Sequence, residues 1–172
     1  KDDETDTVFT AIAAQKRAPI LFVNSSNSHF TSDLKGSYQK ANIRTVVTAL
    51  KQLNLKGITD QIIQQGLSKV ALNTNLMGRW QYLSQAPNII VDVGHNKEGL
   101  HHISAQLKGL TYRKLHLVMG FVKGRKVDEL ISLFPSKAKY YFCTPKLERG
   151  HPIEDFKEVL SVVNWDFNYF ES

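Results

Sequence analysis

The sequence predicts an α/β fold with a Rossmann-like, mostly parallel sheet. From residue 88 onward, short runs of apolar, β-branched and aromatic residues alternate with helical patterns of about ten residues. Such helices are long enough to return the chain along a sheet, so successive strands lie parallel. Polar turns containing glycine follow several of the strand-like runs, and ligands bind at this edge of open α/β sheets. We therefore expect an α/β domain with a ligand site at one sheet edge.

The first part of the chain has a mostly helical pattern. Apolar residues at helical spacing, with glycine or proline after them, predict helices. The expected helices cover residues 5–16, 38–53 and 60–65. A short apolar run at residues 20–23 predicts a buried strand, and the Asn- and Ser-rich segment 24–37 predicts a loop. We expect Thr59 or Asp60 to cap the third helix and Gly66 to end it.

The sequence of the second part of the chain predicts a regular alternation of strands and helices. Each expected strand is a short apolar run, and the helices between them are amphipathic. The expected strands cover residues 88–91, 114–119, 139–143 and 167–170. The expected helices cover residues 98–107, 127–133 and 153–163. Residues 71–78 have no helical stripe and contain two asparagines and a glycine, so we place a boundary between a first domain, 1–77, and a second domain, 78–172.

The composition limits the classes of protein that fit. No run of about 18 apolar residues occurs, so we expect no membrane span and no membrane partner, and we expect no secretory leader. Cys143 is the single cysteine, which excludes an internal disulfide and favours the cytoplasm. The net charge of +6 and the pI of about 9.4 predict an anionic partner. Because Lys and Arg are spread along the chain, with one modest cluster at residues 123–126, we do not expect nucleic-acid binding.

One polar turn is the main candidate for a ligand site. The expected strand 88–91 is followed by Asp92-Val93-Gly94-His95-Asn96, and a helical pattern begins directly after it. Side chains of such a turn and N–H groups of the next helix converge, so these residues are placed to hold a nucleotide. An ionised Asp92 suits two ribose hydroxyls, whereas Asn96 suits a turn or a helix cap. The alternatives are a capping role for Asp92 and a hydrogen-bonded turn histidine at His95.

Three stretches share their order and spacing with the motifs of one enzyme family. They are DLKGSYQKAN at residues 33–42, GRW at residues 78–80 and DVGHN at residues 92–96. They resemble the D-L-x-G-x-x-Q-x-x-N helix entry, the G-R hinge between two domains and the D-x-x-H-N turn of the folylpolyglutamate synthase and dihydrofolate synthase family, within the wider Mur ligase group. The resemblance spans the whole chain.

The resemblance implies a fold and a reaction. Residues 1–77 would be the C-terminal part of a central ATP-binding domain, and residues 78–172 a Mur ligase-type C-terminal domain, truncated at its end. The family adds L-glutamate to a folate or dihydropteroate carboxylate through an acyl phosphate, using ATP. The resemblance implies ATP and Mg²⁺, with the magnesium ligands outside this chain, and a monomer that binds L-glutamate and folate or dihydropteroate. Because no G-x-x-x-x-G-K-[ST] segment occurs, we expect this chain alone to be inactive.

The resemblance also assigns roles to single residues. Asn42 offers the donor and acceptor that an adenine edge needs, with Gln39 one helical turn before it as support. Asp92 would contact the ribose, and His95 would lie against the nucleotide. Arg79 presents a planar fork of donors that fits a γ-phosphate or an acyl phosphate. Arg79 and His95 are thus the catalytic candidates; the alternatives are a solvated helix position for Asn42 and a surface salt bridge for Arg79.

Two positions depart from the family pattern. Lys97 stands where proline usually follows the D-x-x-H-N turn, and Gly124-Arg125-Lys126 stands where D-K-D is common. Lys97 is a candidate to bind a phosphate or the glutamate carboxylate, and its alternative is a solvated helix start. Arg149, in the polar loop after strand 139–143, is a candidate to bind a substrate carboxylate. The histidines near the turn are not spaced to share an ion, so we predict no metal site in this chain.

Two other functions fit the residues. One is the C-terminal half of a peptidoglycan Mur ligase, which uses UDP-sugar acceptors. The spacing from Gln39 to Asn42 and the presence of Trp80 favour the folate enzymes, and we expect Trp80 to lie in the core at the domain junction. The other is a non-enzymatic nucleotide- or nucleic-acid-binding module, which a steep salt dependence of oligonucleotide binding would support.

Overall fold

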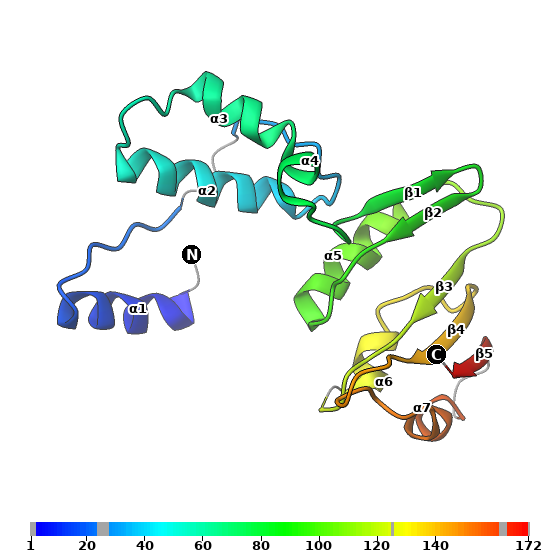
Figure 1. Ribbon diagram of the computed structural model, residues 1–172. Coiled ribbons are helices and arrows are strands. Elements are labelled where there is room, and N and C mark those ends of the chain that lie inside the picture. The colour runs from blue at the N-terminus through cyan, green and yellow to red at the C-terminus, as the bar shows by residue number, and fades with distance from the viewer. Residues whose placement is uncertain (1–2, 24–27, 125, 162–164, 172) are drawn as a thin grey trace. The chain divides into compact units, whose positions relative to one another are not determined.

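A computed structural model describes residues 3–23, 28–124, 126–161 and 165–171 of the chain (Figure 1). These residues divide into two compact units, Lys1–Val91 and Asp92–Ser172. Part of the predicted loop 24–37, the end of the predicted helix 153–163 and Arg125 lie outside the described residues. None of the described helices is long and apolar enough to cross a membrane.

The described part of the first unit is mostly helical. Its helices are α1 (Asp3–Gln15), α2 (Gln39–Leu53), α3 (Asp60–Leu67) and α4 (Val70–Thr74). The first three confirm the predicted helices. Thr59 caps α3 by accepting the Ile62 N–H at 3.3 Å, as expected, but α3 continues through Gly66 to Leu67.

Two local predictions in the first unit were wrong. Residues 20–23 form no strand, and Ile20 and Leu21 are exposed, because an apolar run becomes a strand only where another strand pairs with it. Helix α4 lies where no helix was expected. The Asp33 carboxylate accepts the N–H groups of Val70 and Ala71, at 3.1 and 3.0 Å, and so caps α4 from a distant segment.

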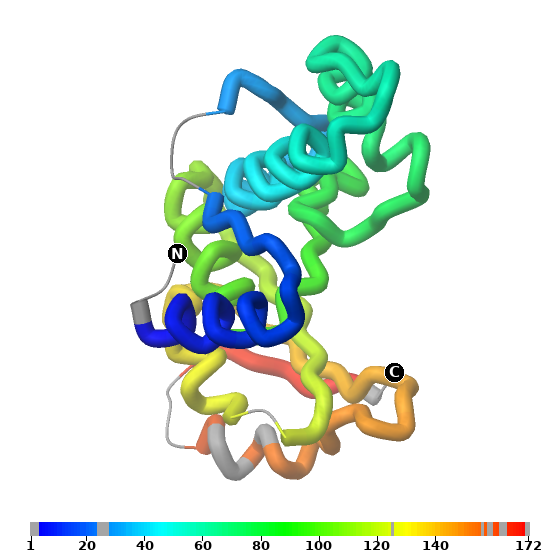
Figure 2. Tube along the Cα trace, turned by 90° about the vertical axis from the view of Figure 1, so that its left-hand side faces the viewer, coloured from blue at the N-terminus to red at the C-terminus, as the bar shows by residue number. Residues whose placement is uncertain are grey.

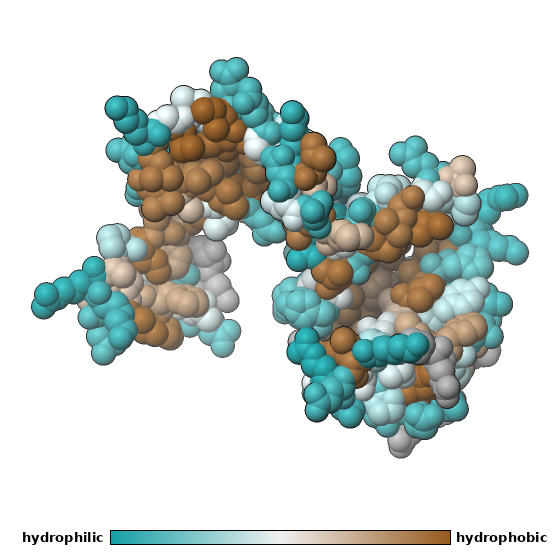
Figure 3. Space-filling view, in the orientation of Figure 1, coloured by the Kyte–Doolittle hydropathy of each residue, from teal (hydrophilic) through white to brown (hydrophobic). Residues whose placement is uncertain are grey.

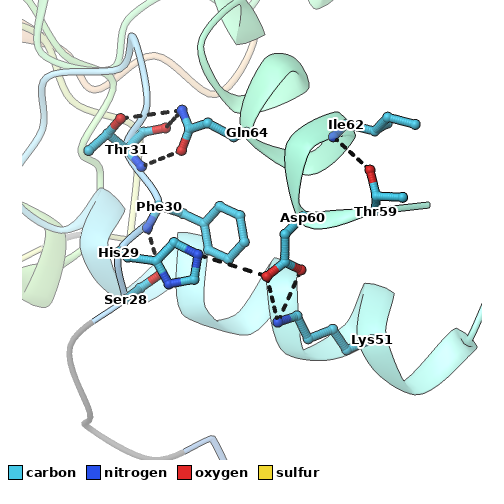
Figure 4. A network of polar contacts seen from close by, with 9 residues as sticks. All are labelled: Ser28, His29, Phe30, Thr31, Lys51, Thr59, Asp60, Ile62 and Gln64. Carbon is cyan, nitrogen blue, oxygen red and sulfur yellow. Dashed lines mark hydrogen bonds and ion pairs between the residues drawn. The ribbon is translucent and has the colours of Figure 1, made fainter.

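A small core and a polar network hold α2, α3 and the loop before them together. The core contains Phe30 of the loop, Ile43 and Val47 of α2, and Ile63 of α3. Figure 4 shows the polar contacts around this core. The side-chain amide of Gln64 donates to the Thr31 carbonyl at 3.1 Å and accepts the Thr31 N–H at 3.0 Å. Apolar side chains also remain on the surface over α2 and α3, where Figure 3 is brown.

A two-stranded antiparallel hairpin ends the first unit. It pairs β1 (Gln81–Gln85) with β2 (Asn88–Val91). Strand β2 was predicted, but as a buried strand of a parallel sheet, which is wrong, since Asn88 and Ile89 are exposed and its partner runs antiparallel. Strand β1 was missed because its sequence, QYLSQ, is too polar to form an apolar run. Trp80, just before β1, is 2% exposed, which confirms its place in a core.

The second unit is a three-stranded parallel sheet with helices between its strands. The strands are β3 (His116–Met119), β4 (Lys139–Thr144) and β5 (Asp166–Glu171), in the order β3-β4-β5. The helices are α5 (Lys97–Lys108), α6 (Val127–Ile131) and α7 (Ile153–Leu160). The alternation of β3, α6, β4, α7 and β5 can be followed in Figure 1, and Figure 2 shows the same part of the chain from yellow-green to red. This arrangement confirms the predicted α/β fold with a parallel sheet.

The core of the second unit lies on one face of this sheet. Tyr140 and Phe142 of β4 are fully buried on this face. Side chains alternate between the two faces along a strand, and Val118 of β3, which is 74% exposed, lies on the other face. The Tyr140 hydroxyl donates to the Pro135 carbonyl at 2.8 Å. Ser104 of α5, which is also buried, donates to the carbonyl of Leu133 and ties α5 to the segment after α6.

Candidate functional site

The polar turn 92–96 is closed by its own side chains. Asp92 Oδ1 accepts the Gly94 N–H at 2.9 Å, and His95 Nδ1 lies 3.3 Å from the Val93 carbonyl oxygen. Asn96 Oδ1 accepts the Gly99 N–H at 2.8 Å and is the N-cap of α5. Asn96 therefore caps the helix as predicted, and the alternative of Asp92 as the cap is wrong. His95 makes the hydrogen bond of a turn histidine while its ring remains exposed.

Two glycines let the turn lie directly against α5. A Cβ atom on Gly94 would clash with Cδ1 of Ile103 and lie 3.5 Å from the backbone of Gly99. A Cβ atom on Gly99 would lie 2.8 Å from Asn96 Oδ1 and 3.5 Å from the Cα of Gly94. Because both glycines lack side chains, the half-buried Asp92 and the exposed His95 are held beside the first turn of α5.

Lys97, the first residue of α5, is linked to the segment after β3. Its Nζ lies 3.7 Å from Oε2 of Glu129 in α6, and Lys126 Nζ lies 3.0 Å from the other oxygen of the same carboxylate. The hydrogen bond to Glu129, and the negative charge of Glu129, raise the pKa of Lys126. The lysine ammonium groups and the carboxylate all remain accessible to solvent. Sequence reasoning missed Glu129, which no local pattern connects to Lys97.

The loops after β3 and β4 are joined at the carboxyl edge of the sheet. The Lys123 N–H donates to the Arg149 carbonyl at 2.8 Å, and the His151 N–H donates to the Phe121 carbonyl at 2.9 Å. Lys123, Leu147, Glu148 and Arg149 line an open hollow with a volume of ≈ 500 Å³. Arg149 thus lies at the predicted sheet edge, beside Lys123, which the sequence analysis named in a basic cluster but gave no role in the site.

At Gly150 the joined loops leave no room for a side chain. A Cβ atom there would clash with the Pro145 carbonyl oxygen and lie 3.1 Å from the Leu147 carbonyl oxygen, both rigid backbone atoms. We expect Gly150→Ala to lower the free energy of unfolding by about 1–3 kcal/mol, the usual cost of overpacking. The matched control is Gly66→Ala within α3, where no atom lies within 4 Å of the new Cβ atom. Urea unfolding followed by circular dichroism measures both, and equal midpoints for the two variants would contradict the expectation.

Asn42 and Arg79 lie in the first unit. The Asn42 side-chain amide donates to Gln39 Oε1 at 3.0 Å, and Gln39 is only 7% exposed while Asn42 is exposed. The buried Gln39 therefore orients an exposed amide that still has a second N–H and a carbonyl oxygen. Arg79 is half-buried and its Nη1 donates to the Gly78 carbonyl at 3.1 Å, and among the described residues it forms no ion pair.

The turn that carries Arg79 has an unusual backbone. Gly78 has φ of 68° and Trp80 has φ of 50°, so left-handed residues flank Arg79 on both sides. The Gln81 side chain supports the turn by accepting the Gly78 N–H at 2.9 Å. A buried tryptophan with positive φ is costly for an L-residue, so the surrounding packing must hold it there.

Another hollow in the first unit contains none of the predicted site residues. It has a volume of ≈ 340 Å³ and lies between residues 21–23, the loop before α2 and α2 itself. His29, Arg44 and Lys51 contribute basic groups to its wall. The described residues contain no group of three or more His, Cys, Asp or Glu side chains that could hold a metal ion.

Comparisons with known proteins agree on one family. Residues 78–172, more than half of the chain, match the family model "Mur ligase, glutamate ligase domain". A probable bifunctional folylpolyglutamate synthase/dihydropteroate synthase of Haloferax volcanii is 26% identical over 131 residues, which are 76% of this chain and 15% of that protein.

Solved structures show the same fold over nearly the whole chain. Escherichia coli FolC in complex with DHPP and ADP is 19% identical, with a TM-score of 0.76 over 99% of this chain and 43% of that one. A bifunctional folylpolyglutamate synthase/dihydrofolate synthase with Mn, AMPPNP and L-glutamate bound is 19% identical, with a TM-score of 0.74 over 95% of this chain and 42% of that one. The chain thus spans less than half the length of the proteins that it matches.

Proposed function

The chain belongs to the Mur ligase family, and we propose from this that it is part of an ATP-dependent amide ligase that adds L-glutamate to a folate or dihydropteroate carboxylate. The observation that carries the proposal is the family match over residues 78–172, which includes the turn 92–96 at the start of α5. The names of its relatives favour folate over the peptidoglycan alternative, and the family match favours a ligase over a non-enzymatic binding module. The domain boundary at residues 77 and 78 remains part of this proposal.

We assign roles in nucleotide binding to four residues. Asn42 would recognise adenine through the amide groups that its bond to Gln39 leaves available. Asp92 would accept the ribose hydroxyls. Arg79 would neutralise phosphate charge and His95 would lie against the nucleotide, since phosphoryl transfer needs positioning and charge stabilisation more than covalent help.

The proposed reaction has two steps. An oxygen of the folate or dihydropteroate carboxylate attacks the γ-phosphorus of ATP, and ADP leaves with the bonding electron pair. The glutamate amine then attacks the acyl carbon, phosphate leaves and the amine loses a proton. The fixed charge of Arg79 stabilises the transferred phosphoryl group, because a guanidinium keeps its proton. His95 must carry a proton on Nδ1 to bond the Val93 carbonyl, so its Nε2 is the atom left to meet the nucleotide.

The other substrates are assigned by charge. Arg149, in the hollow it shares with Lys123, would bind a glutamate carboxylate, and Lys97 is the second candidate for an anionic substrate group. We propose Mg²⁺ as the metal of the whole enzyme, but the described residues offer no set of ligands for it, so no step here runs through a metal. We further propose a cytoplasmic monomer that binds neither nucleic acid nor membrane.

A nucleotide titration of the 172-residue chain tests the proposal. We expect ADP to bind, and Asp92→Asn to weaken its binding about 10- to 100-fold, since hydrogen bonds to a charged group contribute roughly 1.5–3 kcal/mol. Asparagine keeps the oxygen that accepts the Gly94 N–H, so the turn is preserved. The measurement is a chemical-shift titration by NMR, which also detects weak binding.

The control has the same change of charge at the opposite sheet edge. Asp166, the first residue of β5, pairs with Lys139 at 3.7 Å, and Asp166→Asn should leave ADP binding unchanged. A 2′,3′-dideoxy analogue of ADP should bind to the unsubstituted chain as weakly as ADP binds to the Asp92→Asn variant. Equal affinity for ADP and the dideoxy analogue would contradict the ribose assignment, and a steep salt dependence of oligonucleotide binding would favour a nucleic-acid partner instead.

A further inference from the structure

The two departures from the family pattern meet at one carboxylate. Lys97 replaces the usual proline after the turn, and Lys126 replaces the last acidic residue of the D-K-D pattern. They are 29 positions apart in the sequence, yet each has its Nζ within 4 Å of Glu129, at 3.7 and 3.0 Å. We call these three residues the Glu129 cluster.

The charge of the cluster is unbalanced toward the positive. Two ammonium groups share the Glu129 carboxylate, so one positive charge remains within these three residues, and the charge of Asp128 also acts on Lys126. Lys97 also stands at a helix N-terminus, where a cation is unfavourable. The side chains of Lys97 and Lys126 are 63% and 79% exposed. Ion pairs this exposed contribute little to stability, so stability gives little reason for the arrangement. Each ammonium group has three donors, and Glu129 satisfies at most part of them.

The cluster lies next to the residues assigned to the nucleotide. Lys97 follows Asn96 directly, and the bond from the Gly99 N–H to Asn96 fixes the backbone at this point. Lys126 ends the loop after β3 and begins the turn into α6. A group with two or three negative charges would complete the coordination of both ammonium groups at once.

We propose that Lys97 and Lys126 form a clamp for the phosphate groups of the nucleotide, and that Glu129 is the positioning residue that holds the two ammonium groups together. This inference rests on the proposed function and deepens it. The ligand chemistry is a diphosphate, which a nucleotide or free pyrophosphate can supply. In this arrangement Glu129 offsets the repulsion between the two lysines before the ligand arrives.

Titrations of the 172-residue chain with inorganic pyrophosphate, ADP and adenosine test the clamp. We expect Lys97→Ala and Lys126→Ala each to weaken pyrophosphate and ADP binding about five- to tenfold, while adenosine binding stays within about twofold, because only the phosphates meet the lysines. Like the two lysine variants, Glu129→Gln should weaken the binding of pyrophosphate and ADP without changing the binding of adenosine. If Glu129 had a merely structural role, its replacement would weaken the binding of all three ligands together.

The matched control is Lys137→Ala, an exposed lysine just before β4, at the opposite sheet edge. Lysine variants that bind pyrophosphate as well as this control does would overturn the clamp, and tighter pyrophosphate binding by Glu129→Gln would overturn the positioning role. Binding of pyrophosphate that needs both lysines, without binding of ADP, would support the clamp and count against the proposed function. If ADP binds equally well with either lysine replaced, the result would support the proposed function and count against the clamp.

Discussion

Replacing Trp80 with alanine is expected to lower the free energy of unfolding of the first unit by about 3–5 kcal/mol, the range for removing a buried tryptophan. Trp80 is 2% exposed and lies between Arg79 and strand β1, so its loss leaves a cavity beside this turn. Urea unfolding followed by far-UV circular dichroism measures the change. Trp80→Phe keeps much of the apolar volume, so it should lower the free energy of unfolding clearly less than Trp80→Ala does.

The positive φ of Trp80 permits a sharper comparison. Glycine is normally worse than alanine in a folded chain, but at φ of 50° alanine carries a penalty of about 1–2 kcal/mol that glycine does not. We therefore expect Trp80→Gly to be no less stable than Trp80→Ala, although it removes one more carbon atom. If Trp80→Ala were the more stable variant by about 1 kcal/mol, the left-handed conformation would be contradicted.

The parts of the fold that the sequence predicts correctly are those with a local physical cause. Strands β3, β4 and β5 are short apolar runs, and Asn96 is a capping residue directly before a helical pattern. Helix α4 could not be predicted because its cap, Asp33, is 37 residues away from Val70. Strand β1 forms because β2 pairs with it, and a polar five-residue strand gives no signal of its own.

The same distinction applies to the candidate site. The turn 92–96 could be identified because its five residues are consecutive and its glycine packs closely against α5. The contact of Lys97 with Glu129 could not be identified from the sequence, because the pairing of side chains 32 positions apart depends on how α5 and α6 pack. The one available signal was indirect, since Lys97 and Lys126 were already conspicuous as departures from the family pattern.

Stability of the second unit is expected to fall steeply above pH 10 because of Tyr140. Burial of this side chain, and to a smaller extent the neighbouring Tyr112, raise the pKa of the Tyr140 hydroxyl above its ordinary value. Below pH 10 the hydroxyl is protonated in both the folded and the unfolded chain, and its contribution to stability is complete. Above pH 10 only the unfolded chain loses this proton, so the free energy of unfolding falls by about 1.4 kcal/mol per pH unit until the folded pKa is reached.

Tyr140→Phe separates this effect from other groups that titrate at alkaline pH. The variant leaves the Pro135 carbonyl without its 2.8 Å partner, so at pH 7 it should be less stable by about 1–3 kcal/mol. Because phenylalanine has no proton to lose, the deficit should shrink as the pH rises from 9 to 11.5, measured as urea midpoints across that range. Tyr82→Phe, which removes the hydroxyl of an exposed tyrosine in β1, is the matched control. A constant deficit for Tyr140→Phe would mean that the folded chain ionises Tyr140 as readily as the unfolded chain does, and burial would then not protect this hydroxyl.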